Sequence, residues 1–102
     1  MESRLELHAV LENILGSRNV YFNPPESVRM NFPAIVYSRA RPETMRANNL
    51  LYKQFDAYEV IVIDDDPDST IVGKVSQLPM CSWDRHYIAD NLNHDVFRLY
   101  HN

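Results

Sequence analysis

A proline-rich stretch from Tyr21 to Tyr37 constrains the fold more than any other feature of this chain. Its seventeen residues contain three prolines and four aromatic residues, and they lead directly into a β-branched run. Proline fixes its own φ and biases the residue before it toward extended backbone. We therefore expect a non-helical strap over Asn23–Pro33, followed by a first strand at Ala34–Arg39. The strap offers no nucleophile beside a base, no phosphate loop and no metal-binding cluster.

Length and composition favour one small globular domain spanning residues 1–102. The chain is 45% apolar and 24% charged, which is typical of a globular protein rather than a disordered one. No apolar run approaches the roughly 20 residues that cross a bilayer, and the N-terminus lacks a signal-peptide core, so we expect no membrane association. The single cysteine, Cys81, excludes an internal disulfide and fits a reducing compartment.

Two segments carry helix signals. Ser3 and Glu6 form a capping box, and Gly16 suits the left-handed residue after a helix end, which predicts a helix over about 3–15. The apolar stripe of this helix comprises Leu7, Val10, Leu11, Ile14 and Leu15. A second helix is expected with Asp66 as its N-cap and Pro67 at its first position, closed by Pro79.

Four segments carry strand signals. Beside Ala34–Arg39, the strongest is Phe55–Asp64. Its second half is apolar on both faces, so it is expected to lie in a sheet covered on both sides or sealed by a neighbour. The polar connection over Ala40–Gln54 is expected to join these two strands in antiparallel order. Ser82–Ala89 and His94–Tyr100 complete the set as a closing hairpin.

The hairpin turn is expected over Asp90-Asn91-Leu92-Asn93, whose residues tolerate left-handed geometry. A register centred on Asn91-Leu92 places Trp83 opposite Tyr100, Tyr87 opposite Val96 and Arg85 opposite Arg98. The element order is α-β-β-α-β-β. It predicts an α+β fold with a single antiparallel sheet of about four strands and two helices packed on one face.

No catalytic residue, metal site or cofactor site is expected. Asp64, Asp66 and Asp68 have the alternate spacing of a calcium loop, but Ser69 stands where such a loop needs glycine and Val75 where it needs glutamate. Helix capping explains these acids better than acid–base chemistry does. A small metal-dependent enzyme that uses the Asp64–Asp68 run with a hairpin histidine is the remaining enzymatic alternative.

The other reactive side chains favour structural roles. His86, His94 and His101 lack the convergent spacing of zinc ligands, and no basic cluster adjoins Cys81 to lower the pKa of its thiol. The hairpin aromatics favour core or interface packing over stacking on single-stranded nucleic acid.

Charge is segregated along the chain. The net charge is −4, which disfavours sequence-independent binding to DNA phosphates. Residues 29–53 contain five basic residues and one acid, whereas residues 54–70 contain six acids and no base. Such a chain can neutralise itself within the fold, present two solvated faces, or pair with a copy of itself.

Four motifs together resemble a family of small virion proteins of tailed bacteriophages. The motifs cover nearly the whole chain in matching order and spacing; the connection Ala40–Gln54 follows no pattern of the family. They are Tyr21-Phe22-x-Pro24-Pro25-Glu26-x-Val28-Arg29-Met30-x-Phe32-Pro33-x-Ile35-Val36-Tyr37, Ile63-Asp64-x-Asp66-Pro67-Asp68-Ser69, Leu78-Pro79-Met80-Cys81 and Ala89-Asp90-Asn91-Leu92-Asn93-His94-x-Val96-Phe97-x-Leu99-Tyr100. The chain is similar in these motifs to tail terminators, also called tail-completion proteins.

The resemblance implies a structural role without catalysis. Tail terminators form a homohexameric ring that caps the tail tube and then docks to the head-completion protein of the neck. It implies a small α+β subunit, located in the virion at the head–tail junction, that binds copies of itself, the tail tube protein and the neck protein. DNA passes through the ring lumen without specific binding. A head–tail connector or stopper of the neck is the alternative within this class.

Charge segregation suggests where a ring could form contacts. A ring needs a heterologous interface, in which one patch meets a different patch on the next copy. The candidate interface residues are Arg39, Arg41, Arg46 and Lys53 on the basic side and Asp64, Asp65, Asp66 and Asp68 on the acidic side. A second hypothesis is that surplus acids line the lumen and keep passing DNA from adhering.

Overall fold

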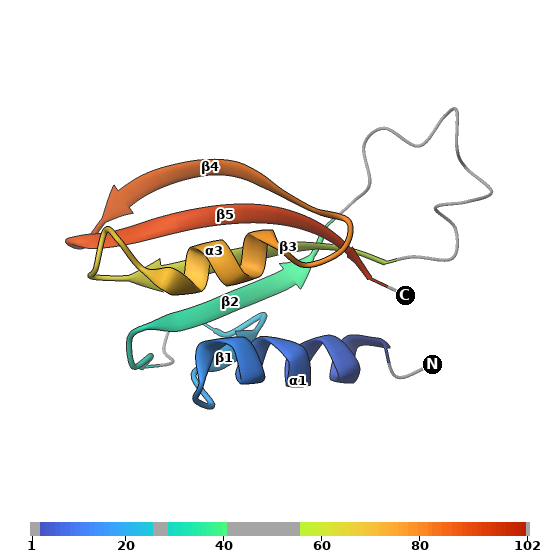
Figure 1. Cartoon of the computed structure of the whole chain (residues 1–102). Coiled ribbons are helices and arrows are strands. Elements are labelled where there is room, and N and C mark those ends of the chain that lie inside the picture. The colour runs from blue at the N-terminus through green and yellow to red at the C-terminus, as the bar shows by residue number, and fades with distance from the viewer. Residues whose placement is uncertain (1–2, 26–28, 41–55, 102) are drawn as a thin grey trace.

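Two helices and a five-stranded mixed sheet make up the described part of the chain, residues 3–25, 29–40 and 56–101 of a computed structural model (Figure 1). The elements in chain order are α1 (Ser3–Leu15), β1 (Val20–Phe22), β2 (Ala34–Arg39), β3 (Asp56–Asp64), α3 (Thr70–Ser76), β4 (Cys81–Ala89) and β5 (Leu92–His101). The predicted α+β class and the bounds of α1 and β2 are confirmed. The prediction of about four antiparallel strands is only roughly right, because the sheet has a fifth strand and is mixed.

The additional strand is β1, which precedes the prolines. The sheet order is β1-β2-β3-β5-β4. β1 pairs in parallel with β2, with Val20 opposite Ile35 and Phe22 opposite Tyr37, while all other neighbours are antiparallel. Val20, Tyr21 and Phe22 are residues that favour strands, but a run of three is too short to carry an alternation signal. The sequence pattern therefore assigned them no strand.

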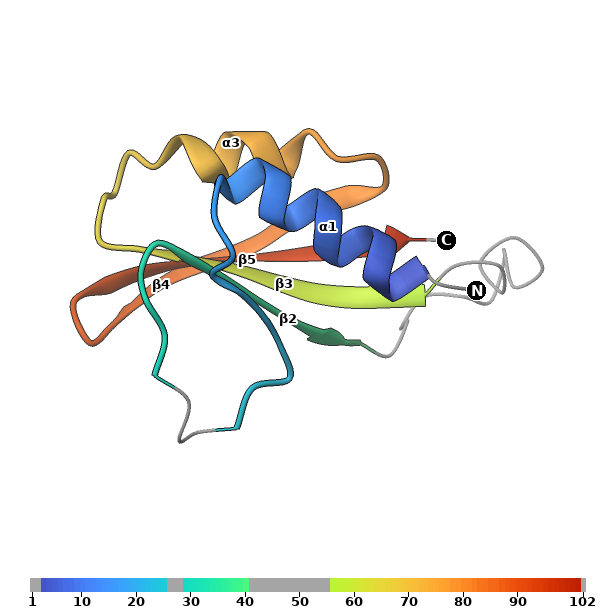
Figure 2. The same ribbon diagram turned by 90° about the horizontal axis from the view of Figure 1, so that it is seen from below.

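The helices and the strap lie on opposite sides of the sheet. Figure 2 shows α1 and α3 together above one face, whereas the described parts of the connection from β1 to β2 extend away from the other face. The prediction of two helices on one face is confirmed. In the described residues, neither helix is long and apolar enough to cross a membrane.

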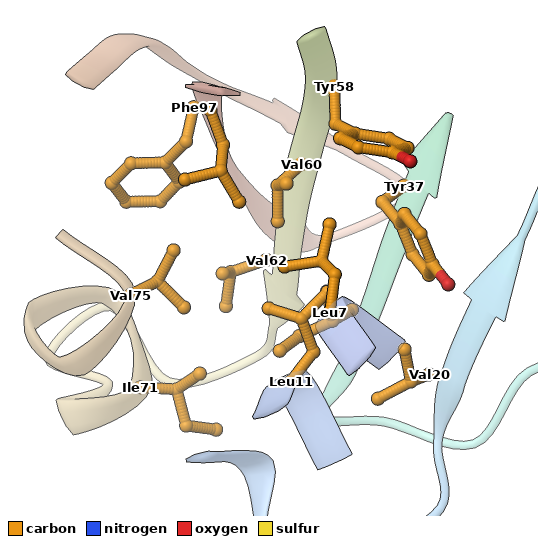
Figure 3. Packing of buried hydrophobic residues seen from close by; sticks show 12 residues of the cluster. Leu7, Leu11, Val20, Tyr37, Tyr58, Val60, Val62, Ile71, Val75 and Phe97 are labelled. Carbon is orange, nitrogen blue, oxygen red and sulfur yellow. The ribbon is translucent and has the colours of Figure 1, made fainter. Parts of the chain in front are cut away.

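The main core lies between the sheet and the two helices (Figure 3). From the sheet it receives the side chains that alternate toward the helices, among them Tyr58, Val60 and Phe97. The helices contribute Leu7, Leu11, Ile71 and Val75. Val10, predicted to lie in the buried stripe, is exposed instead, so the apolar stripe of α1 is narrower than the sequence pattern indicated.

The second helix begins later than predicted. The N-cap is Ser69, whose Oγ accepts a hydrogen bond from the Ile71 N–H at 3.3 Å, not Asp66. Asp64 and Asp66 instead accept hydrogen bonds from the backbone N–H groups two residues on, at 3.1 and 2.9 Å. Acceptance at this spacing bends the backbone into turns. These turns delay the helix, which then ends at Ser76, before Pro79.

The hairpin register also differs from the prediction. Asp90 and Asn91 both have positive φ (54° and 61°), and Ala89 pairs with Leu92. Two central residues with positive φ give the tight turn that joins antiparallel strands directly. The pairing is consequently Trp83 with Phe97, Arg85 with Val96 and Tyr87 with His94, with a bulge at Asp84. The predicted oppositions of Trp83 to Tyr100, Tyr87 to Val96 and Arg85 to Arg98 are wrong.

The strap is non-helical at its described residues, as predicted, but it is not extended throughout, because Asn23 has a positive φ of 46°. Two hydrogen bonds close it. The Asn31 N–H donates to the Tyr21 hydroxyl, and the Asn19 side-chain amide donates to the Pro33 carbonyl, both at 3.3 Å. Phe22 packs against the core, whereas Phe32 is 41% exposed. The strap therefore presents an aromatic side chain to solvent on a backbone fixed at both ends.

Candidate subunit interface

Among the described residues predicted to form a charged interface, Arg39 and the aspartates lie apart within one subunit. Arg39 is exposed at the end of β2 and lies opposite Tyr58 at the start of β3. Asp64 ends β3, six residues farther along, which corresponds to about 20 Å of strand. Arg41, Arg46 and Lys53 lie outside the described residues. Any contact between Arg39 and the aspartates therefore has to be made between molecules.

The aspartates themselves form local turns. Asp64 is buried and Asp66 is exposed, and each holds a backbone N–H as described above. Asp65 and Asp68 are exposed. In the part of the chain that the structure describes, no three His, Cys, Asp or Glu side chains gather closely enough to hold a metal ion. The enzymatic alternative therefore receives no supporting geometry from the described residues.

The hairpin histidines have separate partners. The His86 Nε2 lies 3.0 Å from the Asn93 Oδ1, and the His94 Nδ1 lies 3.1 Å from the Leu92 carbonyl oxygen. The His94 ring also stacks on Tyr87 at 4.6 Å between centroids. These contacts are local to the hairpin and give the rings structural roles.

Strand β4 is the most exposed element of the sheet. It is the terminal strand on one side, and no described residue forms a strand beyond it. All but its first and last residues are exposed, including Trp83 (55%) and Ile88 (68%). A long edge strand with large apolar side chains and unpaired backbone groups is a template for strand pairing with another chain. We call the outer side of Cys81–Ala89 the β4 edge.

Short polar contacts fix the side chains along the β4 edge. The Trp83 indole N–H donates to the Asp95 carboxylate at 3.2 Å, and the Arg85 guanidinium donates to the Asp84 carboxylate at 2.6 Å. The Arg85 guanidinium also lies 5.9 Å from the centroid of the Tyr87 ring. The edge is therefore a defined surface of indole, aromatic and charged groups.

The opposite side of the sheet ends in β1. We call the outer side of Val20–Phe22, together with Arg18 before it and the described strap residues after it, the β1 edge. Arg18 and Arg29 are exposed here, and the Arg4 guanidinium lies 4.6 Å from the centroid of the Phe22 ring. This edge is thus aromatic and basic.

A chain of ionisable groups joins α1 to the sheet beneath. The His8 Nδ1 lies 2.7 Å from the Tyr37 hydroxyl, and its Nε2 lies 3.4 Å from the Glu12 carboxylate. The geometry resembles a carboxylate–imidazole–hydroxyl relay. Tyr37 is only 1% exposed, however, and burial raises the pKa of its hydroxyl. The hydroxyl is protonated and sealed from substrate, so the relay anchors the helix.

An apolar cavity of about 310 Å³ opens between α1, the α3–β4 loop and the end of β5. Val10, Met80 and His101 line it, and the His101 Nε2 is buried without a hydrogen-bond partner among the described residues. Cys81 follows this loop, and burial raises the pKa of its thiol to about 11. A thiol with this pKa remains protonated and unreactive at neutral pH, in agreement with the structural role predicted for it.

Sequence reasoning did not single out the two sheet edges. The alternating aromatics of the last hairpin indicated core or interface packing, but the choice between these depends on which strand is terminal. Strand order is set by long-range pairing and leaves no local signal. The chain matches no protein-family model, no curated protein and no solved structure. The geometry of the edges is therefore the main guide to function.

Proposed function

We propose that the chain is a structural subunit of a tailed-phage virion, a tail terminator that caps the tail tube as a homohexameric ring and joins it to the neck. The observation that carries the proposal is the β4 edge, which exposes Trp83 and Ile88 along a nine-residue terminal strand. Monomeric proteins blunt such edges or cover them. A subunit that works in a ring covers them with the next subunit.

The described chemistry supports a role performed by surfaces. Among the described residues, the Glu12–His8–Tyr37 relay resembles catalytic geometry, but its hydroxyl is buried. The Asp64–Asp68 run forms turns, and the Cys81 thiol is protonated at neutral pH. Of the motifs that resemble those of tail terminators, the strap motif includes the terminal strand β1, and the hairpin motif covers the turn and β5, which pairs with β4.

A head–tail connector or stopper of the neck is the second candidate, because it would use the same kind of ring. The two differ in the surface that the ring binds: the tube end for a terminator and the portal side for a connector. In either ring the net charge of −4 favours a lumen that DNA crosses without adhering. A ring structure with a neutral or basic lumen would contradict that last point.

Addition of the purified chain to growing tail tubes tests the terminator role. We expect elongation to stop at amounts far below one chain per tube subunit, because a cap blocks only the growing end. The measurement is light scattering from tube protein of the encoding phage, with tube lengths checked by electron microscopy. The Trp83→Lys/Ile88→Lys variant should leave growth unaffected.

Lys74→Glu serves as the control, because this exposed residue lies on α3 beside Val10 and Asn13 of α1 and belongs to neither edge strand. It should stop growth as well as the unmodified chain does. Unchanged growth with the unmodified chain, together with binding to the portal-side neck protein, would favour the connector.

A further inference from the structure

We infer that the β4 edge of one copy pairs with the β1 edge of the next, so that the sheet continues from subunit to subunit. This inference rests on the proposed function for its biological setting, but its argument comes from topology, register and charge. The partner at each edge is a second copy of this chain.

Strand direction makes the two edges compatible. β1 runs parallel to β2, and each of the steps from β2 to β3, β5 and β4 reverses direction. β4 therefore runs antiparallel to β1. A second copy placed beside the first in the same orientation brings its β1 against β4 as an antiparallel pair, the more stable arrangement. The two strands meet without inversion of either molecule, as a heterologous interface requires.

The register matches aromatic residues across the junction. Following the pairings across the sheet, Phe22, Tyr37, Val60, Phe97 and Trp83 form one row from β1 to β4. With no shift along the strands, Trp83 of one copy lies beside Phe22 of the next, on the face that carries the helices. Aromatic cross-strand pairs stabilise sheets, and Arg4 already contacts the Phe22 ring. The contact would cover the exposed indole.

Charge also matches at one end of the junction. Following the pairings across the sheet, His86 of β4 lies in the same row as Val20 of β1. Because the two strands are antiparallel, Ile88 lies in the same row as Arg18. Next to Ile88 the hairpin turn exposes Asp90, and the nearby β3–α3 loop exposes Asp65, Asp66 and Asp68. The facing part of the β1 edge carries Arg18, and the strap exposes Arg29, two residues before Asn31, whose N–H donates to the Tyr21 hydroxyl. Acidic groups of one copy therefore meet basic groups of the next.

The bulge at Asp84 limits how the edge can pair. A bulge interrupts a regular ladder and is one of the devices that prevent long, unspecific pairing of edges. β1 is only three residues long, so it needs only a short segment of β4. The bulge in β4 and the short length of β1 together favour a short, specific junction between copies. They disfavour extended pairing of β4 with β4.

Two variants, each damaged at one edge, test the inference. The first is Trp83→Lys/Ile88→Lys, which places charge on the β4 edge. The second is Arg18→Glu/Arg29→Glu, which reverses charge on the β1 edge. All four residues are exposed, so folding should be preserved, which circular dichroism can check. The matched control for the first variant is Leu5→Lys, since Leu5 is 52% exposed on α1.

Size-exclusion chromatography with light scattering at millimolar concentration gives the readout. We expect the unmodified chain and the control to form oligomers and each variant alone to remain at the monomer mass of 12.0 kDa. An equimolar mixture should at least double that mass, because the first variant keeps a sound β1 edge and the second a sound β4 edge. Only a heterologous interface gives this recovery.

Other outcomes overturn the inference. Assembly of the second variant alone would indicate β4 paired with β4, and assembly of the first alone would indicate β1 paired with β1. If each of the two variants assembled on its own, or if the unmodified chain stayed monomeric, the two edges would be excluded as the junction. The proposed function fails separately: rings that form through these edges but leave tail tubes uncapped would keep the junction and refute the terminator.

Discussion

Replacing Phe97 by alanine should lower the free energy of unfolding by about 3–5 kcal/mol. Phe97 is 0% exposed and sits on β5 between the central strand and β4, directly beneath the helices (Figure 3). Removal of its ring loses the transfer free energy of the buried carbons and leaves a cavity that the sheet cannot close. Because domains of this size are stable by only about 5–15 kcal/mol, urea denaturation should show a greatly lowered midpoint.

Phe32→Ala provides the control for this prediction. The same side chain is removed there from the exposed strap, so the loss should stay below about 1 kcal/mol. Equal losses from the two variants would mean that the core lies elsewhere than between the helices and the sheet.

Replacing both turn residues by valine should cost about 2–4 kcal/mol. Asp90 and Asn91 occupy left-handed backbone, with φ of 54° and 61°, where a β-branched residue pays about 1–2 kcal/mol more than a residue that tolerates it. The double variant Asp90→Val/Asn91→Val should therefore loosen the hairpin that presents the β4 edge. Urea denaturation measures the loss, and amide hydrogen exchange should show the lost protection concentrated in β4 and β5.

The variant Asp90→Asn/Asn91→Gly is the matched control, because Asn-Gly is the preferred pair for this two-residue turn. It should keep or raise the stability of the chain. If the valine variant were as stable as this control, the tight turn and the register that it sets would be wrong.

The sequence predicted the elements that depend on local signals. The periodicity from Leu7 to Leu15 and the glycine at position 16, whose φ is +81°, defined α1. β2 was predicted at its observed bounds, because Pro33 and the β-branched run after it mark the strand start. The prolines also predicted correctly that the described strap residues are non-helical.

The elements that were missed or shifted depend on competition between alternative caps or turns and on pairing with strands that are distant in the sequence. Asp66 and Ser69 are both favourable N-cap residues. Asp64 and Asp66 form turns instead, because each accepts a hydrogen bond from the backbone N–H two residues on. A four-residue turn and a two-residue turn fit Asp90–Asn93 equally well in sequence, yet they differ in register. β1 is a strand because it pairs with β2, and a local sequence pattern does not contain this pairing.

Charge segregation suggested a contact between copies, and that contact stays a prediction. Arg39, Asp65, Asp66 and Asp68 are exposed, whereas Asp64 is buried. The exposed Trp83 and Ile88 became candidates only when β4 proved to be the terminal strand. Exposure of an edge is a property of the whole sheet order, which is why local patterns did not reveal it.

We propose that this chain closes into a ring that caps a phage tail tube. Negative-stain electron microscopy of the purified protein, alone and mixed with phage tail tubes, tests this proposal most directly. The proposal predicts six-fold rings, each seated on a tube end, and loss of these rings in the Trp83→Lys/Ile88→Lys variant. Bare tube ends beside freely dispersed protein, or rings bound only at the portal side, would contradict it.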